Sequence, residues 1–136
     1  MVASIVAKVA AQMAILCIED CQDILDNLCE MLTLEGYHAI PANDGKLGVQ
    51  IAILEAPELI ICGIQLPSMD GYQVLRVIRA FSRTRRIPFM FLSTNTMRSS
   101  ILRAILLGAD YYLGKPYSMA ELLDIIRRHE RLFSQD

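Results

Sequence analysis

The sequence contains no tryptophan, only two histidines and no excess of charge of one sign. Its 13 basic and 15 acidic residues are scattered over 136 positions, so there is no basic stripe of the kind that binds a nucleic-acid backbone. No apolar run approaches the roughly 20 residues needed to span a bilayer. The apolar start, MVASIVAKVAAQM, lacks the basic leading region of a secretory signal. We therefore expect a cytoplasmic protein that binds neither nucleic acid nor membrane directly.

Patterns typical of enzymes and metal proteins are also missing. The four cysteines, Cys17, Cys21, Cys29 and Cys62, show neither CxxC spacing nor a nearby histidine, so a zinc site is not expected. All four are interpreted as small apolar residues; the alternative for Cys21, near an expected helix start, is a redox-sensitive thiol. The acidic stretch EDCQD stands where a nucleotide-binding or flavin-binding protein has its phosphate loop. No Ser-His-Asp or Cys-His arrangement is visible, and we expect no enzymatic activity.

Strand-length apolar runs alternate five times with helix-length amphipathic segments. Strands are predicted over residues 13–20, 37–42, 58–62 and 88–93, with a fifth that leads to Lys115. Helices are predicted over about 22–36, 45–55, 72–81 and 97–107, with a last one opened by a Ser118 and Glu121 capping box. Strands this apolar are buried on both faces, which indicates a parallel sheet between two helical layers. The prediction is a doubly wound, three-layer α/β/α sandwich.

The carboxyl ends of the strands are where such a sheet binds its ligands. Two carboxylates, one position without a side chain, two hydroxyls and an amine are expected to meet there. In chain order these residues are Glu19, Asp20, Gly63, Ser93, Thr94 and Lys115.

The segment from about Ala14 to Leu132 resembles the receiver domain of bacterial two-component response regulators. The resemblance rests on IED at 18–20, LPSMDGY at 66–72, LST at 92–94 and GADYYLGKPY at 108–117. It implies a flavodoxin-like fold, a five-stranded parallel sheet of order 2-1-3-4-5. It also implies that Ser93 matches the switch hydroxyl of the family and Tyr112 its switch aromatic, with partial core burial as the alternative for Tyr112.

Gly63 stands where the resembled family has the aspartate that takes a phosphoryl group from a histidine kinase. A glycine supplies neither a nucleophile nor a metal ligand, so the standard reaction is excluded. Glu19 and Asp20 are then remnants of a metal site, magnesium binds weakly or not at all, and Lys115 is free to pair with one of them. Without a phosphoryl group, Ser93 is expected to make a local hydrogen bond.

The leading hypothesis is a stand-alone pseudo-receiver in a phosphorelay pathway that acts by phosphorylation-independent contact with a sensor kinase or output protein. One alternative is a conventional phosphoacceptor that uses another side chain, namely Asp20, Asp70 or Ser93. The other is a small-ligand sensor that uses the pocket vacated at Gly63.

Two further expectations concern surfaces. Residues 1–12 are expected to be an N-terminal extension dispensable for folding, or alternatively an interaction helix, and residues 13–136 the receiver-like domain. Extra apolar residues beside the core-facing lines of the last two helices suggest a weak homodimer or a partner interface. The expected core-facing residues are Met97, Ile101, Ile105, Met119, Leu122, Leu123 and Ile126. The expected interface residues are Leu102, Leu106, Ile125 and Leu132, with packing in a larger core as the alternative.

Overall fold

The structure is a computed structural model that describes residues 12–135, with side chains as far as residue 130. Five parallel strands form one sheet of order β2-β1-β3-β4-β5. The strands are β1 Ala14–Ile18, β2 His38–Ala42, β3 Leu59–Cys62, β4 Phe89–Ser93 and β5 Tyr111–Gly114. The helices are α2 Gln22–Leu34, α3 Gly45–Glu55, α4 Gly71–Ala80, α5 Arg98–Leu106 and α6 Met119–Gln135. The predicted fold class and strand order are confirmed, and the expected extension at 1–12 lies almost wholly outside the described residues.

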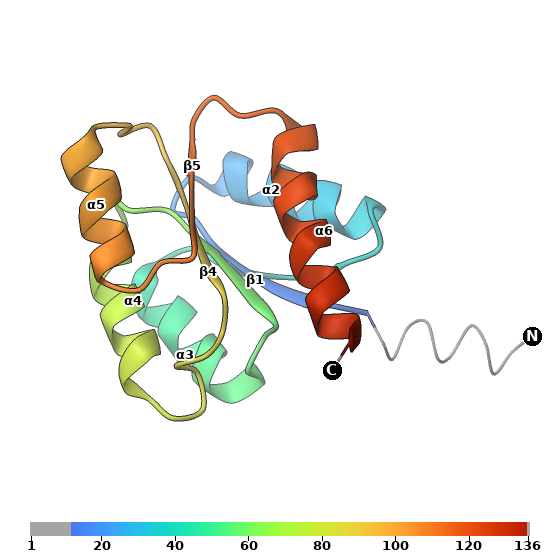
Figure 1. Ribbon diagram of the computed structural model, residues 1–136, viewed down its shortest axis with the longest axis horizontal. Coiled ribbons are helices and arrows are strands. Elements are labelled where there is room, and N and C mark those ends of the chain that lie inside the picture. Colours follow the sequence, from blue (N-terminus) through green and yellow to red (C-terminus); the bar gives the residue numbers. More distant parts are fainter. Residues whose placement is uncertain (1–11, 136) are drawn as a thin grey trace, which may run out of the picture.

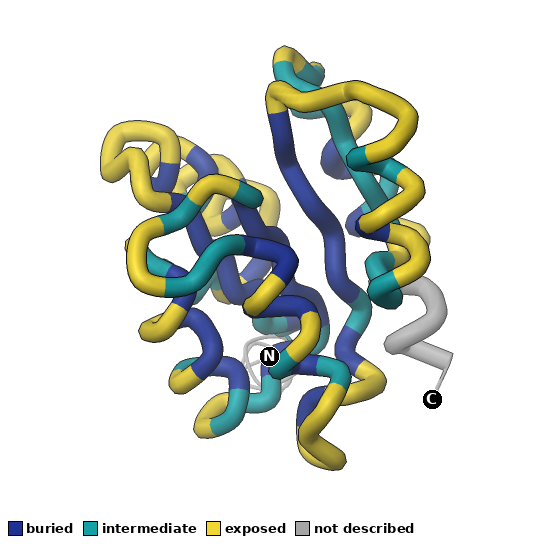
Figure 2. Tube along the Cα trace, turned by 90° about the vertical axis from the view of Figure 1, so that its left-hand side faces the viewer, coloured by how far each residue is buried: buried dark blue, intermediate teal, exposed yellow. Residues whose placement is uncertain are grey.

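Helices cover both faces of the sheet, with α2 and α6 on one side and α3, α4 and α5 on the other (Figure 1). In Figure 2 the buried stretches lie inside the molecule and the exposed stretches lie on its outer turns. Successive residues of β1 point to opposite layers: Ile15 and Cys17 join the core under α2 and α6, and Leu16 and Ile18 the core under α3 to α5. The three central strands β1, β3 and β4 are thereby buried on both faces, as their continuous apolar sequences predict, whereas the outer strands β2 and β5 are only partly buried.

Local sequence signals place the helix ends correctly. Asp70 accepts a hydrogen bond from the backbone N–H of Gln73 at 3.0 Å, and the Gln73 side chain accepts one from the N–H of Asp70 at 2.9 Å, which makes a capping box at α4. Ser118 and Glu121 form the predicted box at α6, with both bonds at 3.1 Å. Gly36 follows α2 with a φ of +95°, which a glycine adopts without strain.

The expected orientation of α5 is wrong. Met97 is 67% exposed and Ile105 is 56% exposed, although both were assigned to the core. Ala104 is instead the fully buried residue of α5. The helix begins at Arg98, so Met97 precedes it. Ala104 faces the sheet, and its small side chain allows the helix to pack closely.

Two other predicted faces need correction. Ile125 is half-buried and packs against the core beneath α2 and α6, so it does not belong to an outer line of α6. Leu132 lies outside the residues whose side chains are described. In α2 the buried residues are Leu25, Leu28 and Leu32, whereas Ile24 and Met31, which share the helical spacing of its apolar residues, are exposed.

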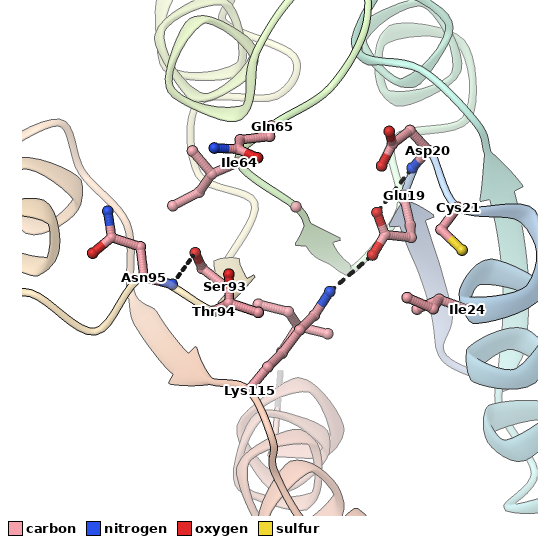
Figure 3. Close-up of a pocket in the computed structure, with 12 residues that line it drawn as sticks. Glu19, Asp20, Cys21, Ile24, Ile64, Gln65, Ser93, Thr94, Asn95 and Lys115 are labelled. Carbon is pink, nitrogen blue, oxygen red and sulfur yellow. Dashed lines mark hydrogen bonds and ion pairs between the residues drawn. The ribbon is translucent and has the colours of Figure 1, made fainter.

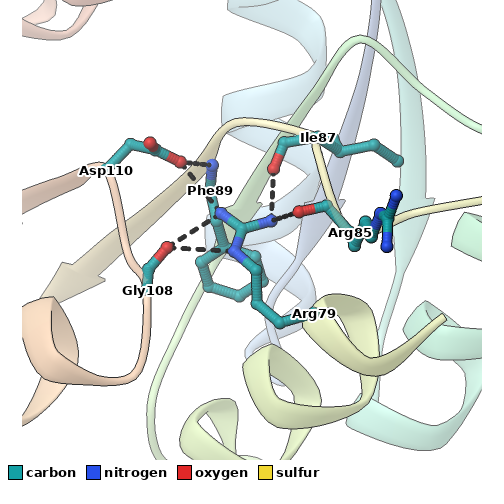
Figure 4. A network of polar contacts seen from close by, with 6 residues as sticks. All are labelled: Arg79, Arg85, Ile87, Phe89, Gly108 and Asp110. Atoms are coloured by element: carbon teal, nitrogen blue, oxygen red, sulfur yellow. Dashed lines mark hydrogen bonds and ion pairs between the residues drawn. The ribbon is translucent and has the colours of Figure 1, made fainter. Parts of the chain in front are cut away.

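Arg79 of α4 connects the segments that lead into β4 and β5, at the amino-terminal ends of these strands (Figure 4). Its guanidinium donates to the carbonyl of Gly108 at 2.9 and 3.1 Å and to the carbonyl of Ile87 at 2.7 Å. It also forms an ion pair of 2.9 Å with Asp110, whose carboxylate accepts from the N–H of Phe89 at 2.8 Å. This network joins α4 to the segments before β4 and β5, and its members are too far apart in sequence for a local pattern to predict it.

Candidate functional site

A pocket of about 230 Å³ opens at the carboxyl ends of β1, β3, β4 and β5 (Figure 3). The residues that line it are Glu19, Asp20, Cys21, Ile24, Gly63, Ile64, Gln65, Leu92, Ser93, Thr94, Asn95 and Lys115. All six residues expected at the carboxyl ends of the strands are among them. They come together because the strands that carry them are parallel and hydrogen-bonded in register.

Glu19 is the most restrained acidic group of the pocket, with a residue exposure of only 9%. Its Oε1 lies 2.9 Å from Nζ of Lys115, and its Oε2 accepts a hydrogen bond of 2.9 Å from the backbone N–H of Asp20. Both contacts are visible in Figure 3. A buried carboxylate is stable only when it is paired in this way. Both Glu19 oxygens are therefore committed within the chain, whereas the side chain of Asp20 is exposed.

Gly63 lies at the floor of the pocket, directly after β3. A Cβ built there would meet Oε2 of Glu19 at 3.4 Å, Cδ2 of Leu66 at 3.6 Å and the carbonyl oxygen of Ile18 at 3.7 Å. These are ordinary contacts, so the neighbouring groups leave room for a side chain. Burial raises the pKa of the adjacent Cys62 thiol, with a smaller contribution from the Glu19 carboxylate, so this cysteine is no nucleophile.

The loop from Gly63 to Asp70 keeps a defined shape. The N–H of Gly71 donates to the carbonyl of Ile64 at 2.7 Å, and the Asp70 capping box holds the start of α4. Gly71 has to be a glycine, because a Cβ there would lie 2.2 Å from the carbonyl oxygen of Gly63. Asp70 is thus engaged in helix capping.

The opposite wall is the segment after β4. Ser93 Oγ accepts a hydrogen bond of 3.0 Å from the backbone N–H of Asn95 (Figure 3). The Asn95 side chain accepts a hydrogen bond of 3.0 Å from the backbone N–H of Met97 and donates one of 2.9 Å to the Ser100 hydroxyl. The hydroxyl of Tyr112 donates to the carbonyl oxygen of Asn95. The side chains of Ser93, Asn95 and Tyr112 therefore hold the segment that leads into α5.

Tyr112 lies outside the pocket, at the end of an aromatic row. Its ring centroid is 6.1 Å from that of Phe91, which is 5.4 Å from that of Tyr72. The guanidinium of Arg103 stacks 4.0 Å above the Tyr72 ring, in a cation–π contact. The row connects β5 and β4 to α4 and α5, behind the wall of the pocket.

The other predicted surface residues lie away from the pocket. Leu102 is 51% exposed and Leu106 is 85% exposed, both on α5, whereas Ile125 packs inward. Residues that sequence reasoning missed are Gln65 and Asn95, at positions one or two beyond the predicted ones. The signal available for them was their place in the segments that follow β3 and β4.

The donor set does not fit a tight magnesium site. Magnesium prefers several oxygen ligands in octahedral geometry. The pocket offers Glu19, whose two oxygens are already engaged, and Asp20. Within residues 12–135, no group of three or more histidine, cysteine, aspartate or glutamate residues is placed to hold a metal ion.

The fold and the site define a class of protein. Residues 15–127 match the model of the response regulator receiver domain, and the chain belongs to that family. Receiver domains are signalling domains that interact with sensor histidine kinases and with output domains. No helix in the described part of the chain is both long and apolar enough to cross a membrane.

Similar proteins include two bacterial regulators. The chain is 35% identical over 119 residues to the transcriptional regulatory protein HprR of Escherichia coli (strain K12), covering 88% of this chain and 52% of that protein. It is 33% identical over 121 residues to the uncharacterized transcriptional regulatory protein YrkP of Bacillus subtilis (strain 168), covering 89% and 48%. The chain thus spans about half the length of these relatives.

Solved structures agree with this assignment. The receiver domain of a sensor histidine kinase from Pseudomonas aeruginosa is 31% identical and superposes with a TM-score of 0.81, covering 88% of this chain and 98% of that one. That structure has a magnesium ion coordinated in its active site cleft. A receiver domain protein from Methanospirillum hungatei, 23% identical with a TM-score of 0.84 and covering 91% and 98%, shares the fold.

Proposed function

We propose that this chain is a pseudo-receiver that acts in two-component signalling through protein contacts, without forming an aspartyl phosphate. The observation that carries the proposal is Gly63 at the family's phosphoacceptor position. A phosphoryl group needs a carboxylate or another nucleophile to accept it. The glycine offers none. Of the nearby carboxylates, Glu19 is ion-paired and Asp70 caps α4, so Asp20 is the acidic side chain against which the proposal has to be tested.

The paired state of the pocket supports independence from phosphorylation. Lys115 is neutralised by Glu19 at 2.9 Å, and Tyr112 is bonded to the segment before α5. A phosphoryl group is not needed to satisfy these side chains. The surface formed by α5 and β5 is therefore expected to keep one conformation, which a partner can recognise directly.

Magnesium is expected to bind only weakly to this chain. Glu19 would have to give up Lys115 or the N–H of Asp20 to become a ligand, and that loss offsets the gain from the metal. Cytoplasmic action and the absence of catalysis are parts of the same proposal.

Phosphotransfer chemistry gives the direct test. The chain is incubated with acetyl phosphate and Mg²⁺, and its intact mass is measured, with Gly63→Asp as the matched variant. We expect no phosphoryl adduct on the original chain. A stable adduct would overturn the proposal in favour of a phosphoacceptor, and loss of that adduct in Asp20→Asn would identify Asp20 as the acceptor.

The small-ligand alternative is favoured by the pocket of about 230 Å³, which has room beside Gly63. A thermal-shift screen of small metabolites tests it, because a ligand that binds the native state raises the Tm. A shift that disappears in Gly63→Leu, in which the side chain fills the pocket, would support this function over the leading one.

The contact surface is proposed to be the exposed face of α5. It carries three large exposed apolar side chains, Leu102, Ile105 and Leu106, and exposed Met97 directly precedes the helix. Exposed apolar patches of this kind are commonly interfaces. Either a sensor kinase or output protein, or a second copy of the chain, is expected to cover it.

A matched pair of variants tests this surface. Leu106→Lys adds a charge to the α5 face, and Leu54→Lys adds one to α3, where the leucine is similarly exposed at 74%. In sedimentation experiments we expect Leu106→Lys alone to abolish self-association. Equal behaviour of the two variants would show that α5 is not the contact surface.

A further inference from the structure

Charge is unevenly divided along the chain. Residues 71–109, which include α4, β4 and α5, contain no aspartate or glutamate but seven of the 13 basic residues. All seven are arginines: Arg76, Arg79, Arg83, Arg85, Arg86, Arg98 and Arg103. The expected scatter of charge is therefore wrong for this segment, although the chain as a whole has a net charge of only −2.

Contacts between α4 and α5 bring these arginines to one side of the molecule. The guanidinium of Arg103 on α5 stacks 4.0 Å above the ring of Tyr72, at the start of α4. Arg79, near the end of α4, donates to the carbonyl of Gly108, which follows α5. Arg76 lies one helical turn from both Tyr72 and Arg79, so its position falls between these two contacts. Arginines are thus spaced along the whole seam between the two helices.

Only Arg79 among the seven arginines forms an ion pair with a described residue, Asp110. The carbonyl of Arg85 accepts from Arg79 at 3.2 Å, but the guanidinium of Arg85 points away from that network (Figure 4). Within the part of the chain whose side chains are described, four exposed guanidinium groups have neither an ion pair nor a hydrogen bond: those of Arg76, Arg85, Arg86 and Arg98. By contrast, Arg127 and Arg128 of α6, on the other face of the sheet, each pair with a carboxylate. The four groups and Arg103 define what we call the arginine face.

The composition of the arginine face favours a protein partner. A guanidinium group forms two parallel hydrogen bonds with one carboxylate, and arginine and aromatic residues are enriched in protein interfaces, where lysine is depleted. Residues 71–109 contain no lysine, and they expose large apolar side chains beside the arginines. Phe81 is 49% exposed at the end of α4, and Leu102 is 51% exposed on α5. A nucleic acid fits less well, because the negative net charge of the chain gives no long-range attraction to a polyanion.

We propose that the arginine face binds an acidic amphipathic helix of a partner protein. The seam between two neighbouring helices is a shape that such a helix fits, with its carboxylates on the arginines and its apolar side chains on the apolar residues beside them. Beside Arg103, a hollow of about 560 Å³ is also lined by Asp20 and Asp70. The carboxylates of the partner are therefore assigned to the other end of the face, which carries Arg76 and Arg85.

This inference deepens the proposed function and rests on it, because it assigns a charge and a shape to the partner through which the chain is proposed to signal. Its chemistry is separate from that of the pocket. Arg76, Arg85 and Arg86 are not among the residues that line the pocket at Gly63. The two proposals can therefore fail separately.

The probe is a fluorescein-labelled helical peptide of about five turns, with a leucine stripe flanked by glutamates. A second peptide has glutamine at every glutamate position, and a labelled DNA duplex is the third probe. The variant chain carries Arg76→Gln and Arg85→Gln. Its matched control carries Arg127→Gln and Arg128→Gln, which remove the same charge from α6. All four side chains are exposed, so both variants should keep the fold, and circular dichroism checks this.

Fluorescence anisotropy measures binding of each probe to each chain. We expect the glutamate peptide to bind the original chain at least about tenfold more tightly than the glutamine peptide, with an affinity that falls as salt is added. The Arg76→Gln, Arg85→Gln chain should lose about tenfold in affinity, and the control chain less than about twofold.

Four results would overturn the inference. They are no binding of the glutamate peptide, equal losses in the two variants, tighter binding of the DNA duplex, or salt-sensitive self-association that Arg76→Gln with Arg85→Gln abolishes. The third result would assign the arginine face to a nucleic acid, and the fourth to a second copy of the chain. A phosphoryl adduct in the phosphotransfer test would refute the proposed function and leave the peptide measurements unchanged.

Discussion

Gly63→Asp restores the third carboxylate of the candidate site, and the structure allows its effect to be worked out. A Cβ at this position meets Glu19, Leu66 and Ile18 at 3.4 to 3.7 Å, which are ordinary contacts, so the backbone does not have to move to accept a Cβ. The glycine shows no left-handed φ, which means that an ordinary residue is unstrained there. The effect of the change should therefore be electrostatic.

Without metal, the new carboxylate should destabilise the chain. Two like charges about 5 Å apart repel by roughly 3 kcal/mol at an effective dielectric constant of about 20. Lys115, which lies against Glu19, offsets part of this repulsion. We expect the free energy of unfolding to fall by about 1–2 kcal/mol relative to Gly63→Asn, which has nearly the same shape and no charge.

Magnesium should reverse the loss, because three carboxylates suit a hard cation better than two. A dissociation constant of about 1 mM would give about 1.4 kcal/mol of stabilisation at about 10 mM Mg²⁺. For a chain of this size, that corresponds to a rise in Tm of roughly 4–6 °C. The original chain and Gly63→Asn should each shift by less than about 1 °C on the same scale.

Calorimetric scans of the three chains, with and without Mg²⁺, decide the matter. An equal shift in the original chain would mean that Glu19 and Asp20 already bind the ion. No shift in Gly63→Asp would mean that Lys115 keeps its partner in the presence of metal. Either result would refute the reasoning about the pocket.

Three further predictions concern stability. Arg79→Leu should lower the free energy of unfolding, measured in urea, by about 2–4 kcal/mol, because it leaves the partly buried carbonyls of Ile87 and Gly108 without their donor. Asp110→Asn should lower it by about 1 kcal/mol or less. Equal losses in the two variants would show that the carbonyl contacts of Arg79 do not matter. His129 packs edge-on to Tyr111 at 4.9 Å, and burial lowers its pKa, with Asp110 opposing. Below its ordinary value of about 6.5, the unfolded chain takes up the proton first, so stability should fall as the pH drops to the lowered native value. His129→Phe should flatten that dependence in urea titrations at several pH values. Deletion of residues 1–12 should change the Tm by only a few degrees, since Gln12, the described residue among them, makes one exposed hydrogen bond; a large loss would place the segment in the core.

The strands and the helix boundaries were predictable because their signals are local. Asp70 and Ser118 lie beside the backbone groups that they cap, and a continuous apolar run indicates a strand buried on both faces. The site was predictable for a related reason. The carboxyl ends of parallel strands lie on the same side of a sheet, so the residues that follow the strands meet there. Glu19, Gly63 and Lys115 follow three of these strands and line one pocket.

The orientation of α5 was not predictable from periodicity. Its apolar residues are spread around the helix, so several lines could face the core. In the structure the side of α5 with Ala104 faces the sheet, because a small side chain lets the helix approach the strands closely. Ile125 was misplaced for the same reason, since half-buried positions at the edge of a helix contact depend on its neighbours.

By itself, the sequence determined the order of elements, the parallel sheet and the absence of a carboxylate at position 63, because these depend on neighbouring residues and on residue identity. The tertiary structure alone decided that Lys115 pairs with Glu19 and not Asp20. It also decided that Arg79 of α4 binds the Gly108 carbonyl and the Asp110 carboxylate, just before β5. Such contacts join residues that are distant along the chain, and their partners are selected by how the layers pack, which no local pattern records.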